Sequence, residues 1–194
     1  MGNVVVSQFV SLDGVFEDPG GSEHSGLGAW TFRFNRGPEG DQLKVDEVMA
    51  AGALLLGRVT YQGFAAAWPS ITDEAGFADK MNSMPKYVVS TTLERADWNN
   101  STIISGNVAD EVRMLKERVD GDILINGSGR LVRTLMEHGL IDEYRLMVFP
   151  IVLGGGKRLF VEAAKATTLR LTETRKAGDC LILIYRPART TGDA

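Results

Sequence analysis

Cysteine and histidine are scarce in this sequence, and their scarcity narrows its possible chemistry. The 194 residues include one cysteine, Cys180, and two histidines, His24 and His138, which lie far apart. A lone cysteine excludes an internal disulfide and a cysteine-rich zinc site, and two distant histidines do not support a metal cluster. We therefore expect no metal site. Because Cys180 lies in the apolar run CLILIY, we expect it to be a small buried hydrophobic residue.

Long apolar runs and an excess of basic residues are also absent. No apolar run reaches the length of a transmembrane helix. The N-terminal sequence MGNVVVSQFV lacks the basic region and the cleavage site of a signal peptide. Acidic residues outnumber basic ones by 25 to 21, a balance that argues against non-specific binding of nucleic acid. These features predict a cytoplasmic protein with neither nucleic-acid nor membrane partners.

Several familiar motifs are incomplete. In the glycine-rich stretch 154–158, Arg158 and then Leu159 follow Lys157, whereas a P-loop requires serine or threonine directly after its lysine. The stretch 127–132 begins Gly-Ser-Gly but has Val132 where the dinucleotide fingerprint has its third glycine. The Gly-x-Ser-x-Gly elbow of serine hydrolases is missing as well. An NTPase, a standard Rossmann domain and a serine hydrolase are therefore disfavoured.

Apolar runs alternate with helical periodicity along a chain whose length fits one domain. We expect strands over 3–10, 53–57, 86–90, 101–105, 122–126 and 143–150, and helices over 41–51, 58–67, 108–119 and 129–138. Two further strands, 168–175 and 179–186, flank a turn at 177–179 and predict an antiparallel hairpin. This order predicts a mixed α/β sheet with both faces covered.

Glycine is abundant, with 22 residues, and it gathers with hydroxyl side chains where predicted strands end. The ends are Gly57-Arg58-Val59-Thr60, Ser90-Thr91-Thr92 and Gly127-Ser128-Gly129-Arg130-Leu131. In open α/β sheets, ligands bind at the carboxyl ends of strands, and helix N-termini attract phosphate. Several such ends together indicate one extended anionic ligand, such as a dinucleotide. Each of them taken alone is also consistent with an ordinary turn.

The ends differ in what each would contribute to such a ligand. Thr60 would bond a phosphate through its hydroxyl, and Arg58 would offer a charged fork. Ser90, Thr91 and Thr92 stand where a NAD-binding Rossmann strand has an acidic residue, so NADP is favoured. A fourth cluster, Leu153-Gly154-Gly155-Gly156-Lys157, would wrap a phosphate or approach a substrate, or form a flexible basic turn.

In order and spacing, these motifs resemble the dihydrofolate reductase-like superfamily. They are most similar to the C-terminal reductase domain of the bifunctional riboflavin-biosynthesis deaminase-reductase, in its free-standing bacterial form. The likeness adds Ser11-Leu12-Asp13-Gly14 and Pro150 to Phe160 to the motifs above. It implies one domain over residues 1–187 with a polar tail at 188–194. The fold expected from it is a three-layer α/β fold with a mixed, mostly parallel sheet of about eight strands and a C-terminal antiparallel hairpin.

The same resemblance implies an NADPH cleft and assigns roles to residues by position. Cofactor binding would fall to Val10, Gly14, Gly57, Arg58, Thr60, Ser90, Thr91, Thr92, Gly127, Ser128, Gly129, Arg130 and Leu131. The substrate end would include Leu153, Gly154, Gly155 and Lys157, with Trp30 either stacking on a heterocycle or anchoring its loop to the core.

The implied reaction is hydride transfer to a C=N bond in a pterin or a ribosylamino-pyrimidine. The proton would come from Asp13, from Asp41 or from water. Asp13 is also a typical turn residue, and Asp41 also fits a helix N-cap. We expect no deaminase domain, because the His-x-Glu element and the Cys-x-x-Cys pair of a zinc deaminase do not occur in this sequence, and the loop 15–38 is longer than the family pattern. Alternatives are therefore a dihydrofolate reductase-type activity or a non-catalytic NADP-binding protein, and the apolar hairpin strand favours a homodimer.

Overall fold

The computed structural model describes residues 1–160 and 166–188, and its strands form one eight-stranded sheet in the order β4-β3-β2-β5-β1-β6-β8-β7. The strands are β1 (Val4–Ser11), β2 (Ala51–Gly57), β3 (Lys86–Val89), β4 (Ser101–Ile104), β5 (Asp122–Asn126), β6 (Glu143–Phe149), β7 (Leu169–Ala177) and β8 (Cys180–Pro187). The helices are α1 (Gly37–Ala50), α2 (Arg58–Ala67), α3 (Phe77–Ser83), α4 (Val108–Arg118) and α5 (Gly129–Glu137), with short 3-10 turns at Trp30–Arg33 and Trp68–Ser70.

Six of the eight strands are joined by parallel pairings, and the C-terminal hairpin adds two strands by antiparallel pairing, of which β8 runs against the six. Strands β4, β3, β2, β5, β1 and β6 are joined by parallel pairings. Strand β8 pairs antiparallel with β6 and with β7. The hairpin turns at Gly178, whose φ of 56° lies in the left-handed region that favours glycine. The predicted mixed sheet of about eight strands with a terminal antiparallel hairpin is confirmed.

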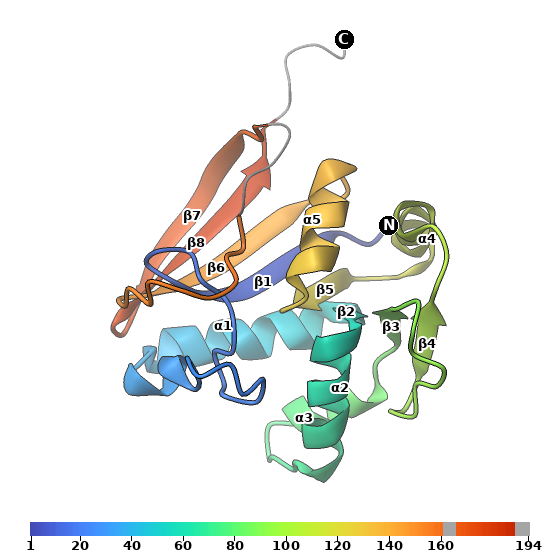
Figure 1. Ribbon diagram of the computed structural model, residues 1–194, viewed down its shortest axis with the longest axis horizontal. Coiled ribbons are helices and arrows are strands. Elements are labelled where there is room, and N and C mark those ends of the chain that lie inside the picture. Colours follow the sequence, from blue (N-terminus) through green and yellow to red (C-terminus); the bar gives the residue numbers. More distant parts are fainter. Residues whose placement is uncertain (161–165, 189–194) are drawn as a thin grey trace.

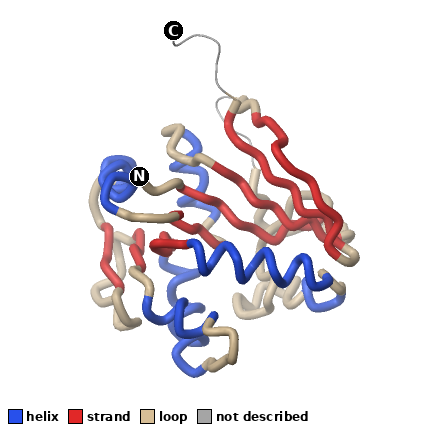
Figure 2. Tube along the Cα trace, turned by 180° about the vertical axis from the view of Figure 1, so that it is seen from behind, coloured by secondary structure: helices blue, strands red, loops and turns tan. Residues whose placement is uncertain are grey.

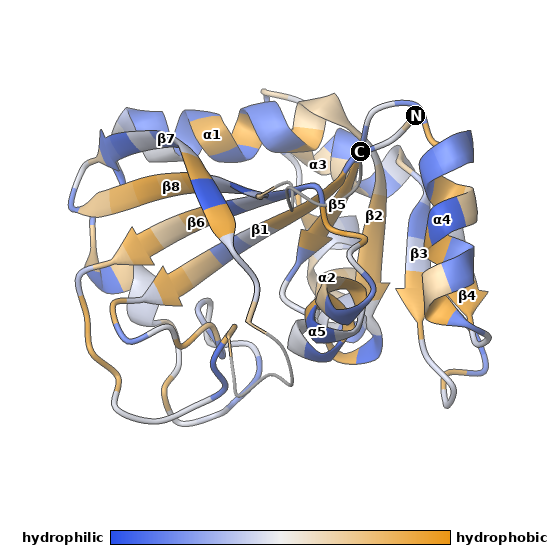
Figure 3. Ribbon diagram, turned by 90° about the horizontal axis from the view of Figure 1, so that it is seen from above, coloured by the Kyte–Doolittle hydropathy of each residue, from blue (hydrophilic) through white to orange (hydrophobic). Residues whose placement is uncertain are grey.

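Helices cover the sheet on both faces because the buried strands are apolar on both sides. In β2, Leu54 and Leu56 pack in the cluster beneath α1, α2 and α3, whereas Leu55 packs in the cluster beneath α4 and α5. Figure 1 shows α4 and α5 on one side of the sheet and the other three helices on the opposite side. Figure 2 shows the strands continuing above α1, and Figure 3 shows that the central strands are largely hydrophobic.

The helix predicted over 41–51 begins earlier than expected. It starts at Gly37, with Arg36 at the N-cap and Pro38 in the first turn, so the prediction that Asp41 caps it is wrong. Proline is favoured at the start of a helix because its missing N–H is not needed there. Asp41 therefore lies inside the helix, where it forms an ion pair with Arg36. Helix α3 was not predicted from the sequence.

Three other features bear on the sequence-based expectations. Cys180 is 1% exposed, and burial raises the pKa of its thiol to about 11, as expected for a small core residue. Within residues 1–160 and 166–188, no helix is both long and apolar enough to cross a bilayer. In the predicted polar tail, residues 189–194 lie outside the described residues.

Candidate functional site

The glycine-marked strand ends are neighbours along one edge of the sheet. Strand β2 ends at Gly57, which pairs with Val89, the residue before Ser90. Strand β5 ends at Asn126, beside β2, and leads directly into Gly127. The three predicted ends thus lie side by side at the carboxyl edge of the parallel strands, the usual ligand-binding edge of an open α/β sheet.

Direct contacts join the turn before α2 to the turn before α5. The Gly57 amide donates a hydrogen bond of 2.8 Å to Ser128 Oγ, and Ser128 Oγ donates one of 3.0 Å to Thr60 Oγ1. Gly127 and Ser128 have φ values of 62° and 61°, both left-handed. A left-handed serine is uncommon and costs free energy, so the surrounding contacts must hold it in place. Two helix N-termini are therefore fixed against one another.

Both helix starts favour a negatively charged group. Gly57 at the N-cap of α2 and Ser128 at the N-cap of α5 provide no side-chain cap to the helix amides. Uncapped N–H groups and the helix dipole make such ends partially positive. Arg58 and Arg130, in the first turns of the two helices, are exposed. These two helix starts, where the sequence predicts the cofactor crevice, can therefore hold an anion.

A buried glutamine that was not predicted supports this turn. Gln8, in β1, is 4% exposed. Its Nε2 donates to the Gly127 carbonyl at 2.6 Å, and its Oε1 accepts from the Gly127 amide at 3.2 Å. Both polar groups of the glycine are thus held by one side chain. A single amide residue in the otherwise apolar and hydroxyl-bearing run 4–11 was the only signal available in the sequence.

Ser90 is organised differently from its prediction as a ligand contact. Its side chain is buried, and its Oγ accepts hydrogen bonds from the amides of Thr92 and Leu93 at 3.2 and 2.9 Å. Ser90 therefore shapes the turn after β3. Thr91 and Thr92 are exposed at this turn.

Asp13 joins the loop after β1 to the loop after β6. Its carboxylate accepts hydrogen bonds from Ser11 Oγ at 2.7 Å and from the amides of Leu153 and Gly154 at 3.1 and 3.0 Å, and it pairs with Arg158 at 3.2 Å. These bonds, led by that from Ser11, hold the pKa of Asp13 far below its usual range. A carboxylate held in its ionised form does not favour the predicted role of Asp13 as proton donor.

The two loops run together beyond Asp13. The Phe16 amide donates to the Lys157 carbonyl, and Lys157 forms ion pairs with Glu17 and Glu23. Gly154 and Gly155 lie exposed at the tip of the second loop, whereas Gly14 in the first loop is half-buried. We call residues 12–17 and 151–159 the paired loops. They lie beyond the ends of β1 and β6, beside the crevice.

Several predicted binding residues are core residues. Trp30 is fully buried, donates its Nε1 to the Glu17 carbonyl at 2.9 Å and packs edge-on against Phe149. It therefore anchors its loop, and its predicted stacking on a substrate is wrong. The side chains of Val10 and Leu131 belong to the core beneath α4 and α5, so only their backbone can face a ligand.

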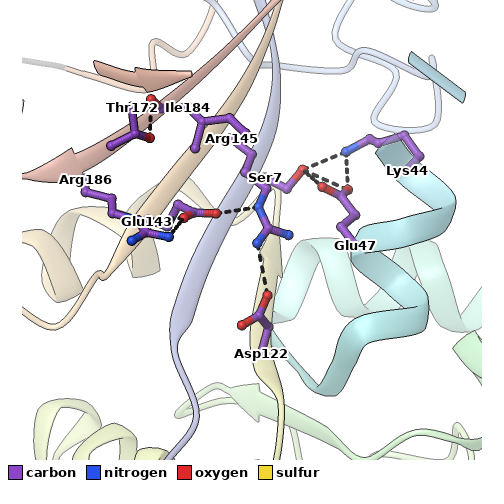
Figure 4. Close-up of polar contacts among 9 residues, drawn as sticks. All are labelled: Ser7, Lys44, Glu47, Asp122, Glu143, Arg145, Thr172, Ile184 and Arg186. Atoms are coloured by element: carbon purple, nitrogen blue, oxygen red, sulfur yellow. Dashed lines mark hydrogen bonds and ion pairs between the residues drawn. The ribbon is translucent and has the colours of Figure 1, made fainter. Parts of the chain in front are cut away.

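Asp41 lies on α1 and not at the strand ends. Its side chain is 61% exposed and pairs with Arg36, which does not favour its predicted catalytic role. The buried acid of α1 is Glu47, two turns later, which was not predicted. Glu47 accepts hydrogen bonds from Ser7 Oγ at 2.8 Å and from Lys44 Nζ at 2.6 Å. This acid faces the middle of β1 (Figure 4).

Comparison with known proteins shows to which family the chain belongs. The model of the family described as RibD C-terminal domain matches residues 3–183. The chain belongs to this family. The uncharacterized protein YwjB of Bacillus subtilis strain 168 is 30% identical over 176 residues, 91% of this chain and 92% of YwjB. The uncharacterized protein YyaP of the same strain is 38% identical over 95 residues, 49% of this chain and half (50%) of YyaP.

Solved structures share the fold of this RibD C-terminal domain. A putative riboflavin biosynthesis protein from Shewanella sp. PV-4 has a TM-score of 0.76 at 21% identity, covering 97% of this chain and all (100%) of that one. Dihydrofolate reductase from Enterococcus faecalis, complexed with NADP(H), has a TM-score of 0.53 at 13% identity, covering 96% of each chain. The predicted family resemblance and the dihydrofolate reductase-like fold are confirmed.

Proposed function

We propose that this RibD C-terminal domain is an NADPH-dependent reductase that transfers a hydride to a pyrimidine-like or pterin-like heterocycle. The observation that carries the proposal is the convergence of Gly57, Ser90 and Gly127 on one edge of the sheet. A dinucleotide is long and anionic, so it needs several adjoining strand ends and partially positive helix starts. Both are present here.

The residues present fit such a cofactor. The uncapped first turns of α2 and α5 would receive the pyrophosphate, with Arg58 and Arg130 adding charge. Thr91 and Thr92 would lie at the adenosine end, next to the turn that Ser90 organises. Glycine at 127 lets the turn before α5 pack closely against the start of α2, because a Cβ there would stand 2.7 Å from Thr60 Oγ1. The cofactor, when bound, supplies the hydride.

The substrate would lie at the paired loops, next to the ends of β1 and β6. Asp13 would position these loops through its bonds to Leu153, Gly154 and Arg158. Holding the heterocycle against the nicotinamide at about 3.5 Å accounts for much of the rate enhancement expected of such an enzyme. Since neither Asp13 nor Asp41 fits a proton donor, the proton would come from water.

The first test is a titration in which the fluorescence of NADPH reports its binding to the protein. Turnover is then followed at 340 nm with two substrates, dihydrofolate and the deaminated ribosylamino-pyrimidine phosphate. We expect binding, and oxidation with the pyrimidine. Binding without oxidation of either would favour the non-catalytic alternative, and absence of binding would refute the proposal. If Arg58 reaches the 2′-phosphate, Arg58→Ala will weaken NADPH more than NADH, whereas equal loss would indicate a pyrophosphate contact.

We also propose a homodimer built on the hairpin. Leu171 and Leu181, each 48% exposed, and Phe160, 43% exposed, are among the exposed large hydrophobic residues of the described chain. Exposed apolar side chains on strands at a sheet edge favour pairing with a second copy. Light scattering will report the mass, and a monomer at micromolar concentration would contradict this proposal.

A further inference from the structure

A row of charged side chains crosses the α1 face of the sheet, away from the carboxyl ends of the parallel strands (Figure 4). Arg145, in β6, donates its Nε to Glu143 Oε1 at 2.7 Å and its Nη2 to Asp122 Oδ2 at 3.1 Å. Arg186, in β8, donates its Nε to Glu143 Oε2 at 2.9 Å. Glu143 therefore lies between two guanidinium groups.

These residues line a cavity of about 870 Å³ at the end of the parallel strands opposite the crevice. The volume falls within the range of small-molecule sites, roughly 300 to 1,000 Å³. Val5 and Ile141 give it an apolar part, and Asp142 and Arg170 add charge at its wall. The cavity is thus separate from the proposed cofactor crevice, which lies at the carboxyl ends of the same strands.

The carboxylates of this cavity are already neutralised. Glu143 receives hydrogen bonds from Arg145 and Arg186, Asp122 receives one from Arg145, and Asp142 pairs with Lys116 at 2.6 Å. Burial alone would raise the pKa of Glu143, but its bonds to the two arginines outweigh burial and lower it. Each of the three acids therefore already has a cationic partner.

The charge of Arg170, in contrast, has no acidic partner among the described residues. Arg170 forms no ion pair with any of residues 1–160 and 166–188, although it lines the cavity. It stands directly opposite Arg186 in the β7–β8 ladder. Like charges at directly opposed positions destabilise a sheet unless an opposite charge lies between them. The alternating series of charges thus ends on two neighbouring cations.

We propose that this cavity binds a small organic anion, whose carboxylate or phosphate group is held between Arg170 and Arg186. One guanidinium group can bind a carboxylate or a phosphate through two parallel N–H bonds. Two adjacent arginines can both contribute such bonds to the same anion. This inference does not depend on the proposed reductase activity.

Calorimetric titration at low ionic strength tests the site with two probes, inorganic phosphate and citrate. We expect saturable binding of one anion per chain at this cavity, in addition to any anion bound at the starts of α2 and α5, and the tighter probe will show whether a phosphate or a carboxylate is preferred. Arg170→Ala should raise the Kd at least about tenfold, because it removes one of two charged partners. Arg170 is exposed, so this variant should keep the native circular dichroism spectrum.

Two control variants separate this site from general charge effects. Arg175→Ala removes another exposed arginine of β7, one that pairs with Glu173, and should leave the Kd within about twofold. Arg58→Ala changes the proposed cofactor crevice and should also leave the Kd for anion binding at this cavity unchanged. An unchanged Kd in Arg170→Ala, loss of binding in Arg58→Ala instead, or no saturable binding of either anion would overturn the proposal.

Discussion

Replacing Gly127 with alanine tests whether the turn between β5 and α5 is built as described. Gly127 has φ of 62°, and a Cβ there would lie 2.7 Å from Thr60 Oγ1. The substitution therefore imposes two separate strains. One is the left-handed backbone, which an L-residue with a Cβ adopts at a cost. The other is the displacement of Thr60, which accepts the hydrogen bond of Ser128.

The matched control is Gly139→Ala. Gly139 has the same φ of 62°, but a Cβ there would meet nothing within 4 Å. Gly139→Ala should therefore lose only the cost of a left-handed backbone with a Cβ, about 1 kcal/mol of unfolding free energy. Gly127→Ala should lose that amount and the Ser128–Thr60 hydrogen bond, which adds about 1 kcal/mol. We expect total losses of about 1 and about 2 kcal/mol.

Urea unfolding, followed by circular dichroism, measures both losses, and NADPH titration measures the effect on the crevice. We expect Gly127→Ala to raise the Kd for NADPH by about tenfold, equivalent to about 1.4 kcal/mol, and Gly139→Ala to leave it unchanged. Equal losses of stability in the two variants would refute the described contact with Thr60. Reduced stability with unchanged NADPH binding would refute the assignment of this turn to the cofactor.

Three further predictions concern titratable groups. Asp13→Asn should leave the pH profile of turnover unchanged near neutral pH, because this carboxyl carries no proton there, and disappearance of a limb of the profile would contradict this. Glu47→Leu should lower the free energy of unfolding in urea by about 3 kcal/mol, because it leaves the Lys44 ammonium without its buried partner. Asp46→Ala, on the exposed face of α1, should lower it by less than about 0.5 kcal/mol. Similar losses in the two variants would contradict this account. Burial lowers the pKa of Lys86 from 10.5 to about 8. The unfolded chain then holds more protons between these values, and the stability of the native protein relative to Lys86→Met should rise with pH across that window; a flat difference would exclude the shift.

The sequence was sufficient for most of the fold because local patterns determine most of it. Apolar, β-branched runs such as 4–11 and 122–126 match their strands closely, and the helices after Gly57 and Ser128 begin where expected. The start of α1 was misjudged because two start signals compete there. Asp41 is a good N-cap residue, but Pro38 already begins a helix four residues earlier than predicted.

The candidate site was predicted in position but not in detail. Glycines and hydroxyl residues at strand ends indicated the crevice, because such residues have a physical reason to be there. Gln8 and Glu47 were not found, since their partners lie 119 and 40 residues away in the sequence. Trp30 was misassigned, and the bonds of Asp13 disfavour the role predicted for it, for a related reason. Composition shows that a loop contains an aromatic or an acid, whereas only the packing shows which way each side chain points.

The most direct measurement is a crystal structure of the protein soaked with NADPH. The account predicts the pyrophosphate between the first turns of α2 and α5, next to Gly57 and Ser128, with the adenosine end beside Thr91 and the nicotinamide toward the paired loops. A dinucleotide bound on any other surface, or an empty crevice at saturating NADPH, would contradict it.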